Sequence, residues 1–348
     1  MIKRSKGEGK VKCVVWDLDN TIWNGTLSEN GNVVLKEGIE DIIETLDNRG
    51  ILQSIASKNH DDQAMDKLKA FNLDQYFLYP QINWNSKSSS MKKIADALNI
   101  SIHALAFIDD QPFEREEVRF NYPHIVCIDA LDVGSILELP ELNPEFVTED
   151  SKVRRFMYLA EIERNAQEET FIGTQEAFLK SLEMVLTISP LKSEDLKRAE
   201  ELTVRTNQLN TTGYTYSYEE LDALRKLESH KLLIASLSDK YGSYGKIGLI
   251  LMECHPDKWV LKLFLMSCRV ISRGIGTVIL NHMIKMAKEE GVRLLGEFVD
   301  NDVNRMMYIT YKFSGFKEWE ERGHVKILEN DFSHIQETPD YVKFIVNI

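Results

Sequence analysis

Carboxylates and a hydroxyl stand at the ends of short apolar runs in the first third of the chain, and a lysine lies in a polar loop between two of the runs. These six residues have types that could act together on a phosphate group: Asp17, Asp19, Ser57, Lys87, Asp109 and Asp110. Converging carboxylates repel one another, and Mg²⁺ relieves this repulsion because its preferred ligands are oxygens. A carboxylate beside Mg²⁺ can attack phosphorus, while a second acid protonates the leaving oxygen and later activates water. A hydroxyl and a lysine can hold the phosphoryl oxygens, so the residue types predict magnesium-dependent phosphoryl transfer.

The elements predicted around these residues would bring them to one edge of a sheet. Four apolar runs have the composition of buried strands, at 11–16, 51–57, 103–109 and 124–130. Amphipathic helical patterns such as GIEDIIETLDNRG alternate with them. This alternation is typical of a doubly wound parallel sheet covered on both faces. Ligands bind at the carboxyl ends of the strands in such sheets, so the six side chains are expected to meet there.

The order and spacing of these residues resemble the four motifs of the haloacid dehalogenase superfamily of phosphotransferases, beginning with DxDNT at 17–21. The alternative is another doubly wound fold with polar strand ends, which explains the positions of the residues but not their identities. The resemblance implies that Asp17 is the nucleophile and that Asp19 is the acid and base, which also offers its backbone carbonyl to Mg²⁺. The implied phosphate or substrate contacts are Thr21, Ser57, Lys58, Asn59 and Lys87. The implied metal positions are Asp17, Asp19, Asp109 and Asp110, of which Asp110 is the principal ligand of its pair.

Longer segments of the sequence resemble one particular family within this superfamily. VVWDLDNTIWNGTLSENG, SIASKNH, FIDDQPFEREEVR, TNQLNTTGYTYS and LMSCRV are similar to the FkbH-like family of polyketide biosynthesis. Members of that family are glyceryl transferase/phosphatases. They take a glyceryl unit from 1,3-bisphosphoglycerate, remove phosphate and load the unit as a thioester onto an acyl carrier protein. The resemblance therefore implies this substrate, the phosphopantetheine arm of a carrier protein as partner, and Asn207 and Asn210 as substrate contacts.

Pro140 and Pro144 predict a domain boundary, with a phosphatase-like domain at 1–143 and an acyl-transfer domain at 144–348. Predominantly antiparallel strands with interspersed helices predict an α+β fold for the second domain. The order of its elements and the pattern N-x6-Y-x3-GF resemble the GCN5-related N-acetyltransferase fold. Such enzymes hold the CoA pyrophosphate at a glycine-containing turn before a helix. RGIG at 273–276 departs from the usual Q/R-x-x-G-x-G/A, so acyl-CoA is not expected here, although a carrier's pantetheine arm could use the same cleft.

Cys268 is the candidate for carrying the acyl group. It ends an apolar run before the predicted long helix, and this helix N-terminus with Arg269 or Arg273 would favour a thiolate. The alternative is core packing, the ordinary place of a cysteine. That alternative is favoured for three other thiols, which together with Cys268 form no zinc or disulfide pattern: Cys13, Cys127 and Cys254.

The composition limits the remaining possibilities. A net charge of −13, from 55 acidic and 42 basic residues, argues against general nucleic-acid binding. No apolar stretch has the length of a membrane span or an export signal, so we expect a cytoplasmic enzyme that uses no membrane. Two alternatives stay open beside glyceryl transfer. One is a magnesium-dependent phosphatase whose second domain only binds a partner, and the other is acyl-CoA-dependent transfer.

Overall fold

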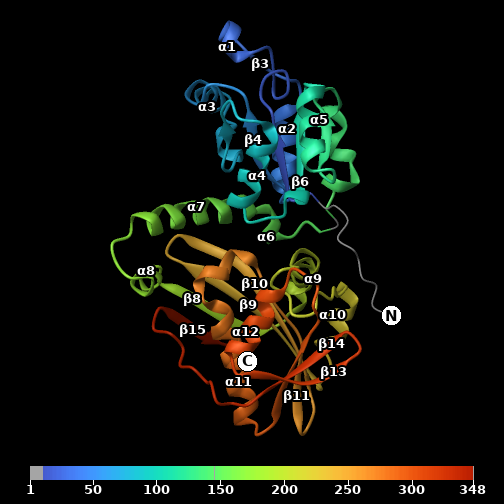
Figure 1. Cartoon of the computed structure of the whole chain (residues 1–348), viewed down its shortest axis with the longest axis vertical. Helices are drawn as coiled ribbons and strands as arrows, with labels where there is room; N and C mark the ends of the chain where they lie inside the picture. The colour runs from blue at the N-terminus through green and yellow to red at the C-terminus, as the bar shows by residue number, and fades with distance from the viewer. Residues whose placement is uncertain (1–10, 145, 348) are drawn as a thin grey trace. The chain divides into compact units, whose positions relative to one another are not determined.

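The computed structural model describes residues 11–144 and 146–347, and its contacts divide the chain into two units. One unit ends at Ile162 and the other begins at Glu163 (Figure 1). Each unit has its own main sheet and its own buried apolar clusters. Within the described residues, no helix combines the length and the apolar character needed to cross a membrane.

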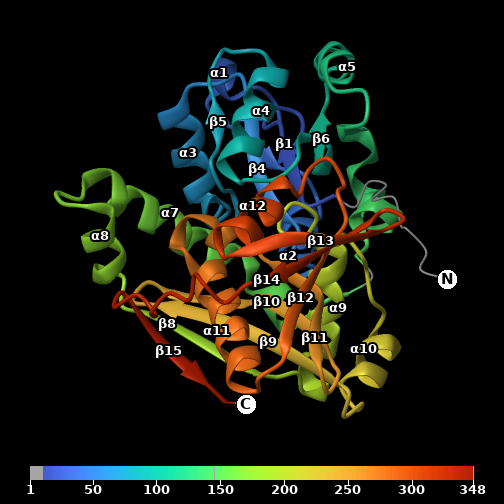
Figure 2. The same ribbon diagram turned by 60° about the horizontal axis from the view of Figure 1, so that its bottom comes forward.

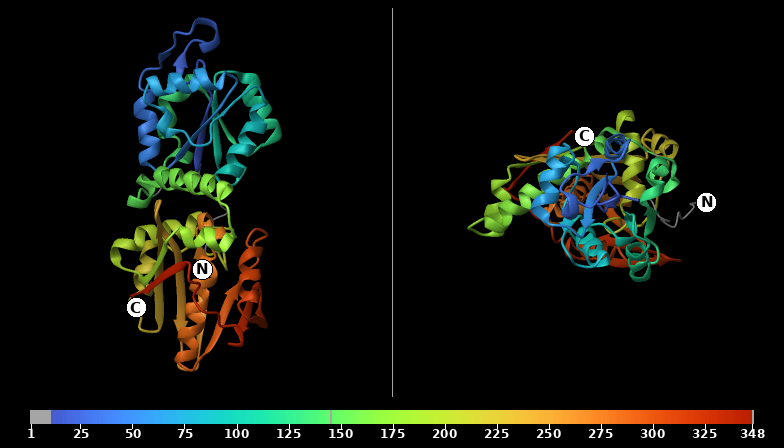
Figure 3. Two further views of the ribbon diagram at one scale, coloured as in Figure 1. Left: turned by 90° about the vertical axis from the view of Figure 1, so that its left-hand side faces the viewer. Right: turned by 90° about the horizontal axis from the view of Figure 1, so that it is seen from above.

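A five-stranded parallel sheet forms the centre of the first unit, in the order β5-β4-β1-β6-β7. Its strands are β1 (Cys13–Trp16), β4 (Leu52–Ser57), β5 (Gln81–Ile82), β6 (Leu105–Asp109) and β7 (Val126–Asp129). The helices that flank it on both sides are α2 (Ile39–Asn48), α3 (Asp61–Ala70), α4 (Lys87–Ala97) and α5 (Pro112–Asn121) (Figure 3). The predicted doubly wound parallel sheet is confirmed.

Side chains of this sheet alternate between two apolar clusters. Val14 and Trp16 belong to one cluster, and Cys13 and Val15 belong to the other. Burial of both faces explains why the strands are apolar at consecutive positions. The smaller elements of the unit are β2 (Trp23–Asn24), α1 (Leu27–Asn30), β3 (Val34–Leu35), η1 (Asp74–Tyr76), η2 (Ile102–Ala104), η3 (Ala130–Glu138), η4 (Pro140–Leu142) and α6 (Glu149–Lys152).

The division between the units falls inside helix α7 (Arg154–Thr170), later than the boundary at 143/144 that the prolines suggested. The start of this helix still packs on the first unit. Arg154 Nη1 donates to the carbonyl oxygen of Gly50 at 2.6 Å, and Arg155 Nε donates to Asp47 Oδ1 at 3.0 Å. These are long-range contacts of buried arginines, which a local proline signal does not report.

A mixed eight-stranded sheet forms the second unit, in the order β13-β14-β12-β11-β10-β9-β8-β15. Its strands are β8 (Met184–Pro190), β9 (His230–Asp239), β10 (Gly242–Cys254), β11 (Lys258–Met266), β12 (Arg293–Phe298), β13 (Phe316–Arg322), β14 (Val325–Asn330) and β15 (Val342–Val346). Neighbours pair antiparallel except at β11–β12 and at β8–β15, which lie side by side at the sheet edge in Figure 2. The helices are α8 (Gln175–Ser181), η5 (Ser193–Asp195), α9 (Leu196–Arg205), α10 (Tyr218–Leu224), η6 (Cys268–Arg273), α11 (Ile275–Glu289) and α12 (Arg305–Phe313).

The two larger apolar clusters of the second unit pack its helices onto the sheet. Helices α11 and α12 contribute to the larger cluster, whereas α9 and α10 contribute to a separate one that includes other side chains of β10 and β11. The sheet of the second unit is mixed and mainly antiparallel, and helices are interspersed among its strands, so the predicted α+β fold of this part of the chain is confirmed.

A buried ion pair anchors the end of α7 within the second unit. Arg164 Nε and Nη2 donate to the two carboxylate oxygens of Asp239, at 2.6 and 2.9 Å, and both side chains are fully buried. The Tyr244 hydroxyl also donates to Asp239, at 3.0 Å, and the Arg164 guanidinium lies 3.9 Å from the centre of the Tyr244 ring. The charges are therefore paired and hydrogen-bonded in a geometry that tolerates burial.

Replacing Arg164 by methionine is expected to destabilise the second unit by about 3–5 kcal/mol, because the Asp239 carboxylate would stay buried without its cation. Hydrogen exchange of the β9 and β10 amides measures the change. The matched control is Lys180→Met, which removes an exposed ion pair with Asp340 and should leave exchange unaltered. If both substitutions changed hydrogen exchange equally, the effect of Arg164→Met could not be attributed to the burial of its ion pair with Asp239.

Candidate active site

Three predicted site residues lie at the carboxyl ends of adjacent strands. Asp17 follows β1, Ser57 ends β4 and Asp109 ends β6, and β1 is the strand between the other two. All three are buried, and the amide of Asp17 donates to the carbonyl oxygen of Ile108 at 2.8 Å. The parallel pairing therefore brings together side chains that are far apart in the sequence.

Lys87 joins these strand ends from the first position of α4. Ser86 precedes the helix as its N-cap and accepts a hydrogen bond from the Ser89 amide, which fixes where the helix begins. The Lys87 ammonium lies 2.5 Å from Asp17 Oδ1 and 3.1 Å from Asp109 Oδ2. Burial lowers the pKa of Lys87, but the two carboxylates raise it by more, so the net shift is upward and the group stays charged.

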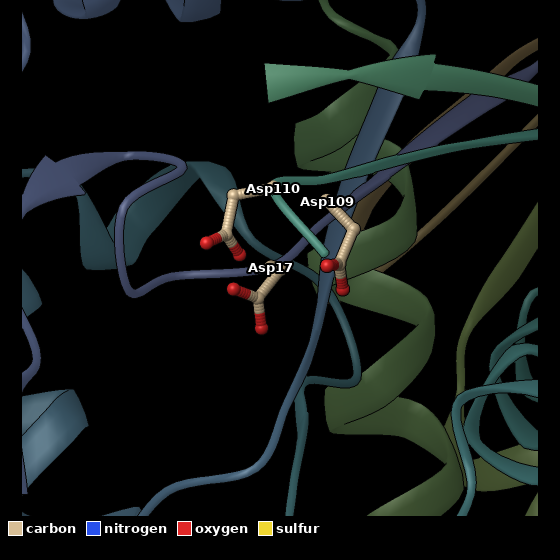
Figure 4. Close-up of side chains that lie close together, drawn as sticks. All are labelled: Asp17, Asp109 and Asp110. Carbon is tan, nitrogen blue, oxygen red and sulfur yellow. The ribbon is translucent and has the colours of Figure 1, made fainter. Parts of the chain in front are cut away.

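Three carboxylates form a potential cation site. Oxygens of Asp17, Asp109 and Asp110 all lie within 4.8 Å of one another, and Figure 4 shows the side chains projecting from neighbouring strand ends. Burial raises the pKa of Asp109 to about 6, with Lys87 opposing the shift and the charge of Asp17 adding to it. Burial and the charge of Asp17 also raise the pKa of Asp110. One lysine does not balance three carboxylates, and an all-oxygen donor set of this kind fits Mg²⁺.

Asp19 is held apart from this cluster by hydrogen bonds. Its Oδ1 accepts from Trp23 Nε1 at 2.7 Å and from the Leu27 amide at 3.1 Å, and its Oδ2 accepts from Asn59 Nδ2 at 3.0 Å. Among the described residues, the carboxylates within one ion's reach are those of the other three aspartates. The expected role of the Asp19 backbone carbonyl as a metal ligand stays a prediction.

The other predicted phosphate contacts differ in their surroundings. Thr21 is fully buried, and its hydroxyl lies 3.5 Å from Asp17 Oδ2. Lys58 forms an ion pair with Glu114 at 2.6 Å. Asn59 is buried, and its Oδ1 has no hydrogen-bond partner among the described residues, although its Nδ2 donates to Asp19. Of Thr21, Lys58 and Asn59, it is therefore Asn59 that keeps a buried hydrogen-bond acceptor in reserve, and this acceptor lies beside Asp19.

Arg115 is a site residue that the sequence analysis did not select. Its Nη1 donates to the backbone oxygen of Asp109 at 2.6 Å, and its Nη2 pairs with Asp129 Oδ2 at 2.5 Å. Arg115 therefore fixes the backbone that carries two of the carboxylates. The available signal was Pro112, which stands at the start of α5 and places residue 115 one turn into the helix.

In the second unit, Cys268 lies beyond the strand rather than at its end. Strand β11 stops at Met266, and Cys268 begins the 3₁₀ helix η6, which separates it from α11. It is partly buried against the larger apolar cluster. A helix dipole acts mainly within its first turn, so the expected support of a thiolate by α11 does not apply at this position.

The two arginines proposed to favour the thiolate are engaged with other groups. Arg269 Nη2 donates to the carbonyl oxygen of Tyr244 at 2.9 Å, and Arg273 Nη1 pairs with Glu168 at 2.9 Å. Arg273 is fully buried. These contacts hold η6, the helix that begins with Cys268, in place. Burial raises the pKa of three other thiols, those of Cys13, Cys127 and Cys254.

Asn210 has a structural role in its own loop. Its side chain is buried, its Oδ1 accepts from the amides of Thr212 and Gly213 at 3.1 and 2.9 Å, and its Nδ2 donates to the Thr206 oxygen at 3.3 Å. The amide is thus used to build the turn. A direct substrate contact by this side chain, which the resemblance implied, would require these bonds to break.

Asn207 is exposed and lies near the Cys268 end of β11. The Met266 amide donates to the carbonyl oxygen of Leu209 at 2.9 Å. Asn207 precedes Leu209 by two residues, and Cys268 follows Met266 by two residues. The structure therefore brings these two predicted residues to the same end of the sheet.

Mg²⁺ is expected to raise the unfolding temperature of the first unit, because it offsets the repulsion among the three clustered carboxylates. Asp110→Asn should remove most of this shift, as measured by calorimetry in magnesium chloride and in EDTA. The control is Asp66→Asn on the exposed surface of α3, which should keep the shift. A full shift in the Asp110 variant would show that the cation binds elsewhere.

Comparison with known proteins gives a family for part of the chain. Residues 20–117 match the family model described as haloacid dehalogenase-like hydrolase. The solved N-terminal part of BF1531 from Bacteroides fragilis, which contains a phosphatase domain complexed with Mg, is 30% identical over 40% of this chain. The match spans 41% of that chain, with a TM-score of 0.34. No curated protein matches this chain.

Other solved structures resemble the remaining part. The ribosomal-protein-S18-alanine N-acetyltransferase from Escherichia coli is 18% identical over 42% of this chain and 92% of its own, with a TM-score of 0.34. The GNAT domain of S. lividans PAT is 15% identical over 41% of this chain and 88% of its own, with a TM-score of 0.33. Within the first unit, residues 20–117 are therefore similar to haloacid dehalogenase-like hydrolases.

Proposed function

We propose that the first unit is a magnesium-dependent phosphatase. The observation that carries this proposal is the meeting of Asp17, Asp109 and Asp110 within 4.8 Å, beside the charged Lys87. The cluster lies at the carboxyl ends of parallel strands, and residues 20–117 match a hydrolase family. Acidic groups, a cation site and a buried ammonium are the components that phosphoryl transfer needs.

Each residue has a defined task in the proposed reaction. Mg²⁺ held by Asp17, Asp110 and the Asp19 carbonyl would supply positive charge against the phosphoryl oxygens. Asp17 attacks phosphorus, the bond from phosphorus to the leaving oxygen breaks, and Asp19 gives that oxygen a proton. Asp19 then takes a proton from water, which attacks phosphorus and releases phosphate from Asp17. Lys87 and Ser57 hold the transferring oxygens throughout.

The contacts of Asp19 fit this assignment. Donors from Trp23, Leu27 and Asn59 fix the orientation of its carboxylate. A residue that passes a proton in both halves of the reaction must keep one position while the leaving group and then water occupy the same place. The unused Oδ1 of Asn59 is available to a hydroxyl group or water beside Asp19.

Asp17→Asn is expected to abolish phosphate release from phosphomonoesters, because the amide is not a nucleophile for phosphorus. Asp19→Asn should lower kcat by about 100-fold or more, the usual contribution of a general acid and base. Released phosphate is measured over a panel of phosphomonoesters with Mg²⁺. Asp66→Asn serves as the control at an exposed aspartate. Turnover that survives in the Asp17 variant would refute the nucleophile assignment.

The finer proposal is glyceryl transfer, and it depends on the similarity of the longer strings to the FkbH-like family. The substrate would be 1,3-bisphosphoglycerate, and the partner would be a cytoplasmic acyl carrier protein with its pantetheine arm. Neither nucleic acid nor membrane is required. The partly exposed Cys268 in the second unit is the proposed acyl carrier within the enzyme.

The proposed transfer of the glyceryl unit needs neither an oxidant nor a reductant. The Cys268 thiolate attacks the carbonyl carbon of the acyl phosphate, the carbon–oxygen bond breaks, and phosphate leaves with the electron pair. The carrier thiolate then attacks the thioester carbon, so the glyceryl unit passes to the carrier and the Cys268 thiolate is regenerated. The second phosphate of the substrate is a phosphomonoester, the group that Asp17 would remove.

Intact-mass analysis tests the thiol route. After incubation with 1,3-bisphosphoglycerate and Mg²⁺, the enzyme is expected to carry a glyceryl adduct that Cys268→Ala lacks. Cys254→Ala is the matched control, because Cys254 is also partly buried and packs against the same apolar cluster. Released phosphate with unmodified enzyme and unmodified carrier would favour the plain phosphatase, whose second unit binds a partner only.

A further inference from the structure

The parallel strands β11 and β12 pair along only part of their lengths. Their register runs from Lys258 opposite Arg293 to Leu261 opposite Gly296, and β11 continues to Met266. In an acetyltransferase-like fold, the space between these strands is the cleft in which a pantetheine chain would lie. The remaining half of β11 therefore needs another partner for its backbone groups.

Residues 209–211, in the connection between α9 and α10, occupy this space. The Met266 amide donates to the Leu209 oxygen at 2.9 Å, and the Thr211 amide donates to the Phe264 oxygen at 3.0 Å. Asn210 forms an antiparallel bridge with Leu265. The segment therefore pairs with β11 through an isolated antiparallel β-bridge and the two hydrogen bonds beside it.

The other side of the segment bonds to the chain beyond β12. The Val299 amide donates to the Thr211 oxygen at 2.9 Å. Asn304, which is fully buried, donates from Nδ2 to the oxygens of Asn210 and Val299, both at 2.9 Å. Leu209, Asn210 and Thr211 are only 2%, 1% and 0% exposed. The segment is thus buried, with bonds to β11 on one side and to the chain just beyond β12 on the other.

The turn before α11 is occupied in a similar way. Arg273, the basic residue of RGIG, is fully buried and pairs with Glu168. The Tyr341 hydroxyl lies 2.8 Å from the position that a Cβ would take on Gly274, and Met266 Cε lies against that position on Gly276. These side chains pack closely against the two glycines, and the basic residue of the turn is already paired with a carboxylate. A CoA pyrophosphate would have to displace Glu168 before it could pair with Arg273.

We infer that residues 209–211 exclude CoA from the second unit and so determine which acyl donors it can use. The segment takes the place of a pantetheine chain, and Arg273 and Tyr341 close the pyrophosphate turn. An acyl phosphate or a carrier-bound arm must reach Cys268 from outside the sheet, past the exposed residues Asn207 and Gln208. The inference holds whether or not the first unit is a phosphatase.

Binding measurements on the full-length protein test this inference. In calorimetric titrations with CoA and with acetyl-CoA, we expect no binding tighter than about 1 mM. Hydrogen exchange should show the amides of Thr211, Met266 and Val299 protected like those of β10, with no change when CoA is added. Micromolar binding, new protection at 209–211 or 274–278 on adding CoA, or rapid exchange of these three amides would overturn it.

Two variants distinguish a specific role of Asn304 at residues 209–211 from a general loss of stability. Asn304→Asp replaces the Nδ2 donor that bonds to the oxygens of Asn210 and Val299 with an acceptor. Hydrogen exchange of the Thr211 and Val299 amides should then become at least roughly tenfold faster. Asn330→Asp is the matched control, since Asn330 is also buried and donates from Nδ2 to the Ser314 oxygen at 2.7 Å. Equal loosening at 209–211 in both variants would show that Asn304 has no special role there. Phosphate release reports separately on the Asp17 site.

Discussion

One ammonium group joins the carboxyl ends of three neighbouring strands, and the geometry of the candidate active site depends on it. Lys87 reaches Asp17 after β1, Asp109 at the end of β6 and the Ala56 oxygen in β4. It neutralises one carboxylate of three, so negative charge remains. The upward pKa shifts of the aspartates show that protons are one way to reduce that charge, and a divalent cation is the other.

A different constraint acts on the second unit. Strands β11 and β12 diverge, and beyond that point their backbone groups no longer hydrogen-bond to each other. Buried N–H and C=O groups must be paired, and a gap between two strands can be filled by a ligand or by the chain itself. The Leu209 oxygen and the Thr211 amide pair with β11, while the Thr211 oxygen pairs with Val299. The segment 209–211 therefore supplies, from within the chain, backbone partners that β12 does not give to the second half of β11.

Sequence patterns predicted the features that are local or that follow from strand order. Continuous apolar runs identified β1, β4, β6 and β7, and parallel pairing then required Asp17, Ser57 and Asp109 to converge. Long-range contacts could not be predicted in this way. The buried contact of Arg154 with Gly50 keeps the start of α7 in the first unit, so the units divide later in the chain than the prolines indicate. The polar sequence around Asn210 likewise does not reveal that the side-chain amide of Asn210 builds a turn.

The short helix η6, which begins with Cys268, is held in place by contacts of two arginines. Glu168 holds Arg273 at one end of η6, and the Tyr244 oxygen holds Arg269 near the other. Because η6 separates Cys268 from α11, the helix N-terminus gives a thiolate little support. If Cys268 carries an acyl group as proposed, the position of the substrate matters more than the helix dipole. With residues 209–211 paired to β11, the approach that the proposal favours is on the outer side of the sheet end, where Asn207 is exposed.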